Sequence, residues 1–287
     1  MTNDKKNVIF SYLNILKREI EKKKYLSFLR KIFNLIFKIF INSIKKKLNI
    51  IVNLDKQDNS KIYNYSLEKL FAHFNCDKGK LLRQNNNIIK THNYTPFYEK
   101  YFSKIKNNKI RILELGSHEG KGLAAFYFFF PKSILFGANI NPFQMKFQSN
   151  RIEEIFIDVS SKETLKNFCK HFKEDFDIII DDASHNLRDI LLALPLLFKK
   201  LNKGGLYVIE DINQFEVYKN LNPTNETLTP IKILKNIQQK KEFNSQFIET
   251  NDVEYLKDNI AEYFFEKGDM VVNGHNISDI VFLKKNG

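Results

Sequence analysis

The sequence of 287 residues predicts an α/β fold in which a doubly wound, mostly parallel, seven-stranded sheet follows an N-terminal helical extension. Two observations support this prediction. From residue 62 onward, short apolar runs alternate with helical patterns, whereas residues 25–48 show only a helical pattern. In addition, acidic residues and glycines gather just after the apolar runs, where open parallel sheets bind their ligands.

Five apolar runs are expected to form the core strands. They read IRILELG, SILFGANI, IEEIFIDV, FDIIIDD and GGLYVIEDI, and they span residues 110–116, 133–140, 152–159, 176–182 and 204–212. A late pair, MVVNGH (270–275) and DIVFLKK (279–285), is expected to supply the other two strands. Between the fourth and fifth runs, residues 187–201 have helical periodicity, and Gly204 and Gly205 end the connection. This alternation is typical of a Rossmann-like sheet.

Residues 25–48 are expected to form a basic amphipathic helix. Polar residues recur in steps of three or four from Ser27 to Lys45 and leave a narrow polar stripe among Phe, Ile and Leu. Neither a transmembrane span nor a secretory signal is expected, because no apolar stretch is long enough and no small-residue cleavage site follows. The run of lysines at 45–47 favours peripheral contact with an anionic membrane. Packing on the main domain or on a second subunit is the alternative, so a homo-oligomer stays open.

Positive charge is concentrated in this arm. The net charge is +13, and residues 1–56 hold 14 Lys or Arg against 4 Asp or Glu, which leaves only +3 for the rest of the chain. The main domain therefore has no basic excess, and no nucleic acid is expected as a partner. Cys76 and Cys169 lie far apart in the sequence and suggest no disulfide framework. We expect a cytoplasmic protein, and contact of the arm with the inner face of the cell membrane is one of its two interpretations.

These patterns divide the chain into three segments. Residues 1–56 form the basic arm, residues 57–105 a helical segment that could act as a lid, and residues 106–287 the sheet domain. The polar stretch NLDKQDNSK, residues 53–61, is expected to be the linker after the arm.

The first polar cluster follows the first strand and reads LELGSHEGKG. It contains Glu114, Gly116, Ser117 and Gly120. Glycine after a strand lets the backbone turn tightly and approach a ligand, and the next helix offers free N–H groups. The stretch matches neither G-K-[ST] nor G-x-G-x-x-G, so it is not a phosphate loop or a dinucleotide fingerprint. By itself it fits a structural turn as well as a ligand-binding one.

Acidic residues end the fourth and fifth runs. Asp181 and Asp182 close one, and Glu210 and Asp211 close the other. Neighbouring strands lie about 4.8 Å apart, so these carboxylates would crowd together and raise one another's pKa. A hard divalent ion resolves that conflict, and Mg²⁺ binds a few carboxylates together with waters or substrate oxygens. We therefore expect a metal at Asp182, Glu210 and Asp211; the alternative is that one or two of them cap the next helix.

His185 follows Asp182 by three residues. An imidazole titrates near neutral pH and can accept a proton from a reacting hydroxyl. A structural histidine is the alternative interpretation.

Together these stretches resemble class I S-adenosylmethionine-dependent methyltransferases. More narrowly, the chain resembles the magnesium-dependent sugar O-methyltransferases of macrolide biosynthesis, of the mycinamicin and macrocin type. The resemblance runs from about residue 66 to about residue 218 and includes NCDKGK, THNYTPFYEKYF, ILELGSHEGKG, FDIIIDDASH and GGLYVIEDI. The arm lies outside it. The resemblance implies S-adenosyl-L-methionine and Mg²⁺ as cofactors.

The resemblance also implies roles for single residues. The cofactor contacts are expected at Glu114, Gly116, Ser117, Gly120, Asn139, Asp158 and Asp181. The metal ligands of the family correspond to Asp182, Glu210 and Asp211. The general base corresponds to His185, which would take a proton from one of two vicinal sugar hydroxyls held by Mg²⁺.

Two positions depart from the family pattern. Asn139 stands where many class I methyltransferases have an acid that grips both ribose hydroxyls, and an amide gives up those charge-assisted bonds. Ala183 stands where relatives often have glycine, and alanine would be strained there if the residue had a positive φ. Before the first strand, His92, Tyr94 and Tyr98 are interpreted either as a lid over the cofactor or as an ordinary packing cluster.

The expected function is methylation of a sugar hydroxyl in a glycoside or glycan. One rival is a noncatalytic protein that keeps the fold and is recruited to a membrane or a partner by its arm, and Asn139 favours it. A nucleic-acid methyltransferase is the other rival, but an acidic cluster would repel a phosphate backbone.

Overall fold

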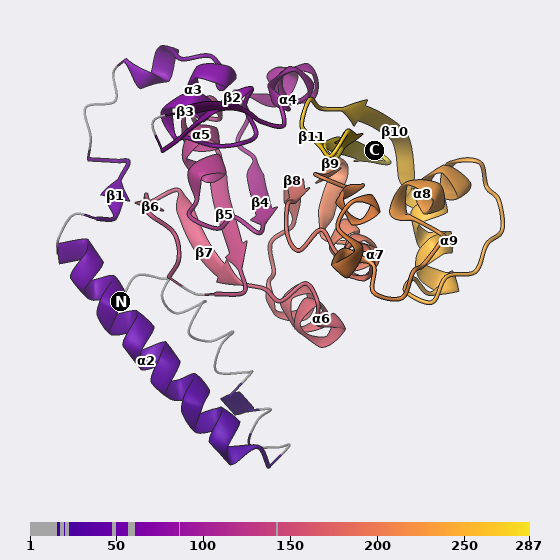
Figure 1. Ribbon diagram of the computed structural model, residues 1–287, viewed down its shortest axis with the longest axis horizontal. Helices are drawn as coiled ribbons and strands as arrows, with labels where there is room; N and C mark the ends of the chain where they lie inside the picture. The colour runs from indigo at the N-terminus through magenta and orange to yellow at the C-terminus, as the bar shows by residue number, and fades with distance from the viewer. Residues whose placement is uncertain are drawn as a thin grey trace.

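The computed structural model describes residues 16–17, 20, 23–47, 50–56, 61–85, 87–141 and 143–287. At its centre is a seven-stranded sheet in the order β10-β13-β9-β8-β4-β5-β7 (Figure 1). Its strands are β4 (Arg111–Leu115), β5 (Ile134–Asn139), β7 (Ile152–Phe156), β8 (Phe176–Asp181), β9 (Leu201–Ile209), β10 (Ile260–Lys267) and β13 (Asp279–Lys285). The pairs from β7 to β9 are parallel, and β13 is antiparallel to both of its neighbours. The predicted doubly wound, mostly parallel sheet is confirmed.

One of the two late strands differs from the prediction. DIVFLKK forms β13, but MVVNGH forms a separate small hairpin, β11 (Val271–Val272) with β12 (His275–Asn276). Asn273 and Gly274 both have positive φ, as a two-residue hairpin turn requires. The seventh strand is instead β10, which pairs with β13 at the edge of the sheet. Most of β10 is half-buried or exposed, so it lacks the apolar run that marks the core strands.

Helices cover both faces of the sheet because alternate strand residues point to opposite sides. One face packs against α3 (Leu67–His73), α4 (Thr95–Phe102) and α5 (Lys121–Phe129). The other packs against α6 (Lys162–His171), α7 (Leu187–Phe198), α8 (Pro230–Gln238) and α9 (Thr250–Asn259). Residues predicted as helical at 187–201 correspond to α7. A hairpin of β2 (Leu81–Gln84) and β3 (Asn87–Lys90) and four short 3₁₀ turns complete the body; the turns are Ile62–Asn64, Ser103–Ile105, Gln214–Glu216 and Lys219–Leu221.

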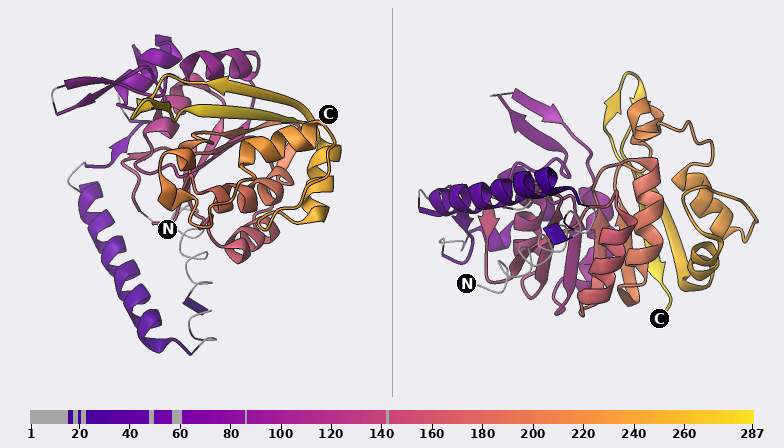
Figure 2. Two further views of the ribbon diagram at one scale, coloured as in Figure 1. Left: turned by 45° about the vertical axis from the view of Figure 1, so that its right-hand side comes forward. Right: turned by 90° about the horizontal axis from the view of Figure 1, so that it is seen from below.

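The N-terminal arm contains α2 (Tyr25–Lys47), a single helix of 23 residues that extends away from the sheet domain (Figures 1 and 2). After it, β1 (Val52–Asn53) pairs in parallel with β6 (Phe147–Gln148), so the start of the predicted linker is ordered against the body. None of the helices in the described ranges is long and apolar enough to cross a membrane. The parts of the predicted arm and linker at residues 1–15, 18–19, 21–22, 48–49 and 57–60 lie outside the described residues.

Candidate catalytic and metal site

The turn after β4 requires glycine at its first position. Gly116 has a φ of 75°, and a Cβ there would lie 2.1 Å from the carbonyl oxygen of Asp182, far inside contact distance. Gly120 also has a left-handed backbone, with a φ of 78°, at the start of α5. The glycine turn therefore lies directly against the tip of β8. The tight turn that the sequence pattern predicts is present, and its approach to a ligand stays a prediction.

Asn139, at the end of β5, braces this turn. Its side-chain oxygen accepts the backbone N–H of His118 at 2.7 Å, and its amide donates to the hydroxyl of Ser117 at 3.0 Å. Asn139 and Ser117 are both buried. The predicted ribose contact of Asn139 would therefore have to compete with bonds that hold the turn.

Asp158 follows β7 and also serves a local turn. One of its oxygens accepts from the N–H of Ser160 at 3.0 Å and from the Ser160 hydroxyl at 2.6 Å. Its predicted contact with the cofactor is not tested by these bonds.

The two acids at the tip of β8 point to opposite faces. Asp181 lies near the hydroxyl of Tyr207 at 3.3 Å, and burial raises its pKa to about 6. Asp182 turns toward the other face, where it meets Lys78. Only Asp182 therefore joins the acids of β9. Ala183 does not have a positive φ, so the strain considered for an alanine at this position does not arise.

Lys78 lies in the middle of the acidic residues, and sequence reasoning missed it. Its Nζ lies 2.5 Å from Asp182 Oδ2, 2.9 Å from both carboxylate oxygens of Glu210 and 3.3 Å from Glu114 Oε1. Lys78 is 2% exposed. Burial alone would lower its pKa, but the charges of Asp182, Glu210 and Glu114 raise it well above its usual value. The only signal in the sequence is its place in the stretch NCDKGK, which has no pattern of its own.

One ammonium does not balance three carboxylates, of which Glu114 and Glu210 are buried and Asp182 is 22% exposed. Burial raises the pKa of Glu210 well above its usual value and also raises the pKa of Asp182, although Lys78 opposes both shifts. The pKa of Glu114 rises to about 7 through burial. The cluster thus has more carboxylates than ammonium groups, and a further cation can neutralise the remaining negative charge.

The aromatic residues of α4 and the segment before it bind the two acids that follow β9. Tyr98 donates its hydroxyl to Glu210, and Tyr94 donates to Asp211 Oδ1 at 2.5 Å. Both tyrosines are fully buried among neighbouring rings, as the packing interpretation predicts. His92 Nδ1 lies 3.0 Å from Asp211 Oδ1. Burial raises the pKa of Asp211, but the hydrogen bond and charge of His92 outweigh it and lower that pKa overall.

Asp182, His185 and Asp211 form the candidate metal site. One potential ligand atom from each lies within 4.8 Å of the others. His185 Nε2 is 3.8 Å from Asp182 Oδ1 and 4.0 Å from Asp211 Oδ2. His185 and Asp211 both have a left-handed backbone with a φ of 52°, a conformation that costs energy and is often found at functional sites. The two carboxylates fit a hard divalent cation, and the imidazole lies beside them.

Glu210 lies outside this group, although it was predicted as a third ligand. Lys78 and Tyr98 bind its carboxylate. The structure thus brings two of the three predicted ligands together with the predicted base. Whether Glu210 binds the metal stays a prediction.

Glu114 shows whether the site matches the amino group of the predicted cofactor. Its Oε2 is buried and has no hydrogen-bond partner among the described residues. An unpaired buried carboxylate oxygen is costly, and an amino group supplies the missing donor. The amino-acid part of S-adenosylmethionine carries such a group, so Glu114 fits the predicted cofactor.

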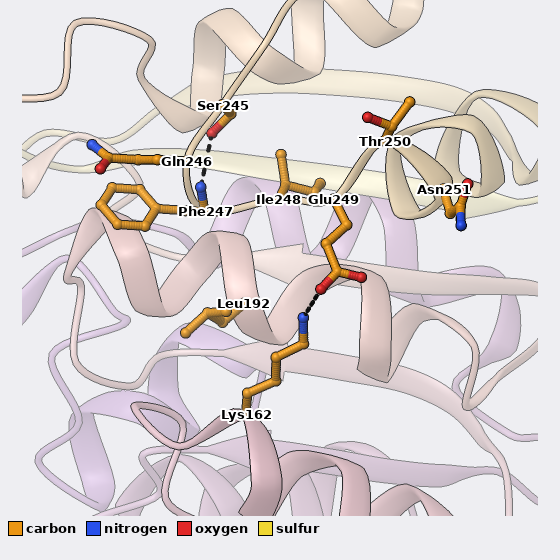
Figure 3. Close-up of a pocket in the computed structure, with 9 residues that line it drawn as sticks. All are labelled: Lys162, Leu192, Ser245, Gln246, Phe247, Ile248, Glu249, Thr250 and Asn251. Carbon is orange, nitrogen blue, oxygen red and sulfur yellow. Dashed lines mark hydrogen bonds and ion pairs between the residues drawn. The ribbon is translucent and has the colours of Figure 1, made fainter.

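A separate hollow of about 510 Å³ lies between the start of α6 and residues 245–251 (Figure 3). An ion pair between Lys162 and Glu249 crosses it. None of the predicted site residues lines this hollow.

Comparison with known proteins agrees with the geometry. No family model matches the chain. A mycinamicin VI 2''-O-methyltransferase of Micromonospora griseorubida is 33% identical over 128 residues, which are 42% of this chain and 32% of that protein. A rhamnosyl tetracenomycin-C 2'-O-methyltransferase of Streptomyces olivaceus is 28% identical over 141 residues, which are 47% and 37% of the two chains. The resemblance to sugar O-methyltransferases is confirmed.

The fold comparison leads to the same group. The structure of the MycE methyltransferase in complex with Mg, SAH and mycinamycin VI superposes with a TM-score of 0.58 at 23% identity, covering 77% of this chain and 55% of that one. The chain has the class I methyltransferase fold. It spans about a third of the length of the curated relatives that it matches.

Proposed function

We propose that this protein is an S-adenosylmethionine- and Mg²⁺-dependent O-methyltransferase that acts on a sugar hydroxyl of a glycoside or glycan. The observation that supports this most is the approach of Asp182, His185 and Asp211 to within 4.8 Å at the edge where Glu114 keeps a free oxygen. The matched relatives are named as methyltransferases of sugar hydroxyls, which agrees with that chemistry.

Each residue of the site would have a separate role in the reaction. When bound, the divalent ion would lower the pKa of a coordinated sugar hydroxyl, and S-adenosylmethionine would supply the methyl group. Asp182 and Asp211 would hold the ion, and Glu114 would hold the amino group of the cofactor. His185 Nε2, which faces both aspartates, would accept the proton of the hydroxyl.

A transfer assay tests this proposal. Labelled S-adenosylmethionine is incubated with mycinamicin VI and with rhamnosyl glycosides, in EDTA and after Mg²⁺ is restored. We expect label in the sugar only with Mg²⁺, and none with Asp182→Asn. Transfer that is indifferent to EDTA would remove the metal from the reaction. If no glycoside is methylated, calorimetry with S-adenosylhomocysteine decides between an untested substrate and the noncatalytic rival, because a pure scaffold need not bind that ligand.

We also propose that α2 holds the enzyme at an anionic membrane surface. One face of α2 carries large apolar residues that are 36–83% exposed; they are Leu26, Leu29, Phe33, Ile36, Phe37, Phe40 and Ile44. Leu35 and Asn42, on the opposite side of the helix, are buried. The apolar face therefore points outward, and the surplus of lysine in the arm complements acidic headgroups.

Vesicle binding tests the membrane proposal. The protein is sedimented with phosphatidylglycerol vesicles and with neutral phosphatidylcholine vesicles at the same lipid concentration. We expect binding to the anionic vesicles only, and loss of it in Phe33→Glu/Phe40→Glu. A stable dimer in light scattering, with no vesicle binding, would show that a second copy covers this face instead.

A further inference from the structure

Lys78 belongs to a segment outside the sheet, and its side chain enters the site. It lies between α3 and β2, and its side chain reaches residues 104 and 132 positions further along the chain. Gly122 at the start of α5 leaves the necessary space, because a Cβ there would lie 2.6 Å from Glu114 Oε1 and 3.0 Å from Lys78 Cε. The side chain is thus enclosed on the side of the cofactor turn as well as at the strand tips.

The charges around Lys78 do not balance. Its ammonium contacts three carboxylates, those of Glu114, Asp182 and Glu210, which leaves a formal charge of −2 among the groups in contact. Buried charges are tolerated only when they are paired. A divalent ion matches the remainder in sign and size.

The two carboxylate oxygens of Asp182 have different partners. Oδ2 binds Lys78 at 2.5 Å, while Oδ1 faces His185 at 3.8 Å. Lys78 therefore fixes the rotation of this carboxylate so that one oxygen is presented to the candidate metal site. Glu210, held through both of its oxygens, is fixed by the same ammonium.

We propose that Lys78 is a positioning residue that serves as the permanent counter-cation of the acidic strand tips. It lets the buried Glu114 and Glu210 and the partly exposed Asp182 lie close together before the divalent ion binds, and it orients Asp182 toward that ion. This inference rests on the proposed metal site. It assigns to the chain itself part of the charge compensation that the sequence pattern attributed to a metal alone.

The test compares thermal unfolding in EDTA and in millimolar Mg²⁺. In Lys78→Met the three carboxylates that Lys78 contacts in the wild type carry a formal charge of −3. The folded state of the variant therefore depends more strongly on an added cation. We expect a lower midpoint than wild type in EDTA, and a Mg²⁺-induced rise that exceeds the wild-type rise by roughly 5 °C or more. Lys80→Met, an exposed lysine two residues along the same segment, is the matched control and should behave as wild type.

A second variant covers the case in which Lys78→Met does not fold in EDTA. Lys78→Met/Glu210→Gln removes one charge of each sign and restores the formal charge of −2. We expect it to fold in EDTA and to show a smaller Mg²⁺-induced rise than Lys78→Met. If both variants fail to fold with and without Mg²⁺, Lys78 acts through packing and the proposal is overturned.

The outcomes separate this inference from the proposed function. An equal Mg²⁺-induced rise in wild type and Lys78→Met would leave the metal site standing and remove only the role of Lys78. A lack of any Mg²⁺ effect in both proteins would remove the metal site, and the role of Lys78 with it.

Discussion

His185 is held between two carboxylates on a left-handed turn, with its Nε2 3.8 Å from Asp182 and 4.0 Å from Asp211. Asparagine tolerates such a backbone and cannot act as a base near neutral pH, so His185→Asn removes the imidazole at the lowest conformational cost. We expect the transfer rate to fall by about 100-fold or more. Calorimetry with S-adenosylhomocysteine should give an unchanged Kd. A variant with the wild-type rate would exclude His185 as the base.

Glu114 gives a second prediction at the scale of one residue. Its pKa is raised to about 7, and the ionised form is the one that binds an amino group. We therefore expect the affinity for S-adenosylhomocysteine to fall as the pH falls below about 7, because the carboxyl becomes protonated. Glu114→Gln should weaken binding by about tenfold at pH 8 and flatten the pH dependence, since one charge-assisted bond is lost. Binding by the variant that still titrates near pH 7 would assign the effect to another group.

Among the elements, β1 shows how the arm is joined to the body. Asp55, just after β1, accepts bonds from the N–H of Asn150 and the hydroxyls of Ser149 and Tyr127. Burial raises the pKa of Asp55, but these bonds outweigh it and lower that pKa below 3.8. The bonds thus contribute stability that is complete above pH 3.8 and is lost as the pH falls through the folded-state value.

Asp55→Ala should lower the free energy of unfolding by about 1 kcal/mol at pH 7, since the carboxylate is partly exposed and its bonds are screened. The difference from wild type should shrink as the pH falls below 3.8. Lys56→Ala, the exposed neighbour, is the control in urea unfolding. A deficit that persists unchanged at pH 3 would show that the carboxylate charge is not involved.

The strand tips were predictable from sequence because parallel pairing fixes their neighbours. β8 lies beside β9, so Asp182, Glu210 and Asp211 had to converge once the two strands were recognised. Edge strand β10 was missed because its residues are not uniformly apolar. Lys78, His92 and Tyr98 could not be placed, because their contacts join residues more than 100 positions apart through side-chain packing. For the same reason the charge that Lys78 supplies was not foreseen.

In the whole molecule, the arm joins the body near the carboxyl end of β5. The described part of α2 extends from the body (Figures 1 and 2), and its Lys38 donates to Asn141, in the loop after β5, at 3.2 Å. The acidic site lies after β8 and β9. Ile51 and Leu54 are buried, so a truncation that spares β1 has to end before residue 51. We expect removal of residues 1–49 to abolish binding to anionic vesicles and to leave methyl transfer to a soluble glycoside unchanged. Equal loss of both would mean that the arm supports the active fold.

We propose that the carboxylates of Asp182 and Asp211, from neighbouring strand tips, hold a divalent ion beside His185 at the site of methyl transfer. Anomalous diffraction from crystals grown with Mn²⁺ and S-adenosylhomocysteine tests it most directly. We expect a single strong peak within about 2.5 Å of carboxylate oxygens of Asp182 and Asp211, on the side of His185. No peak there, or a peak bound only by residues elsewhere on the chain, would contradict it.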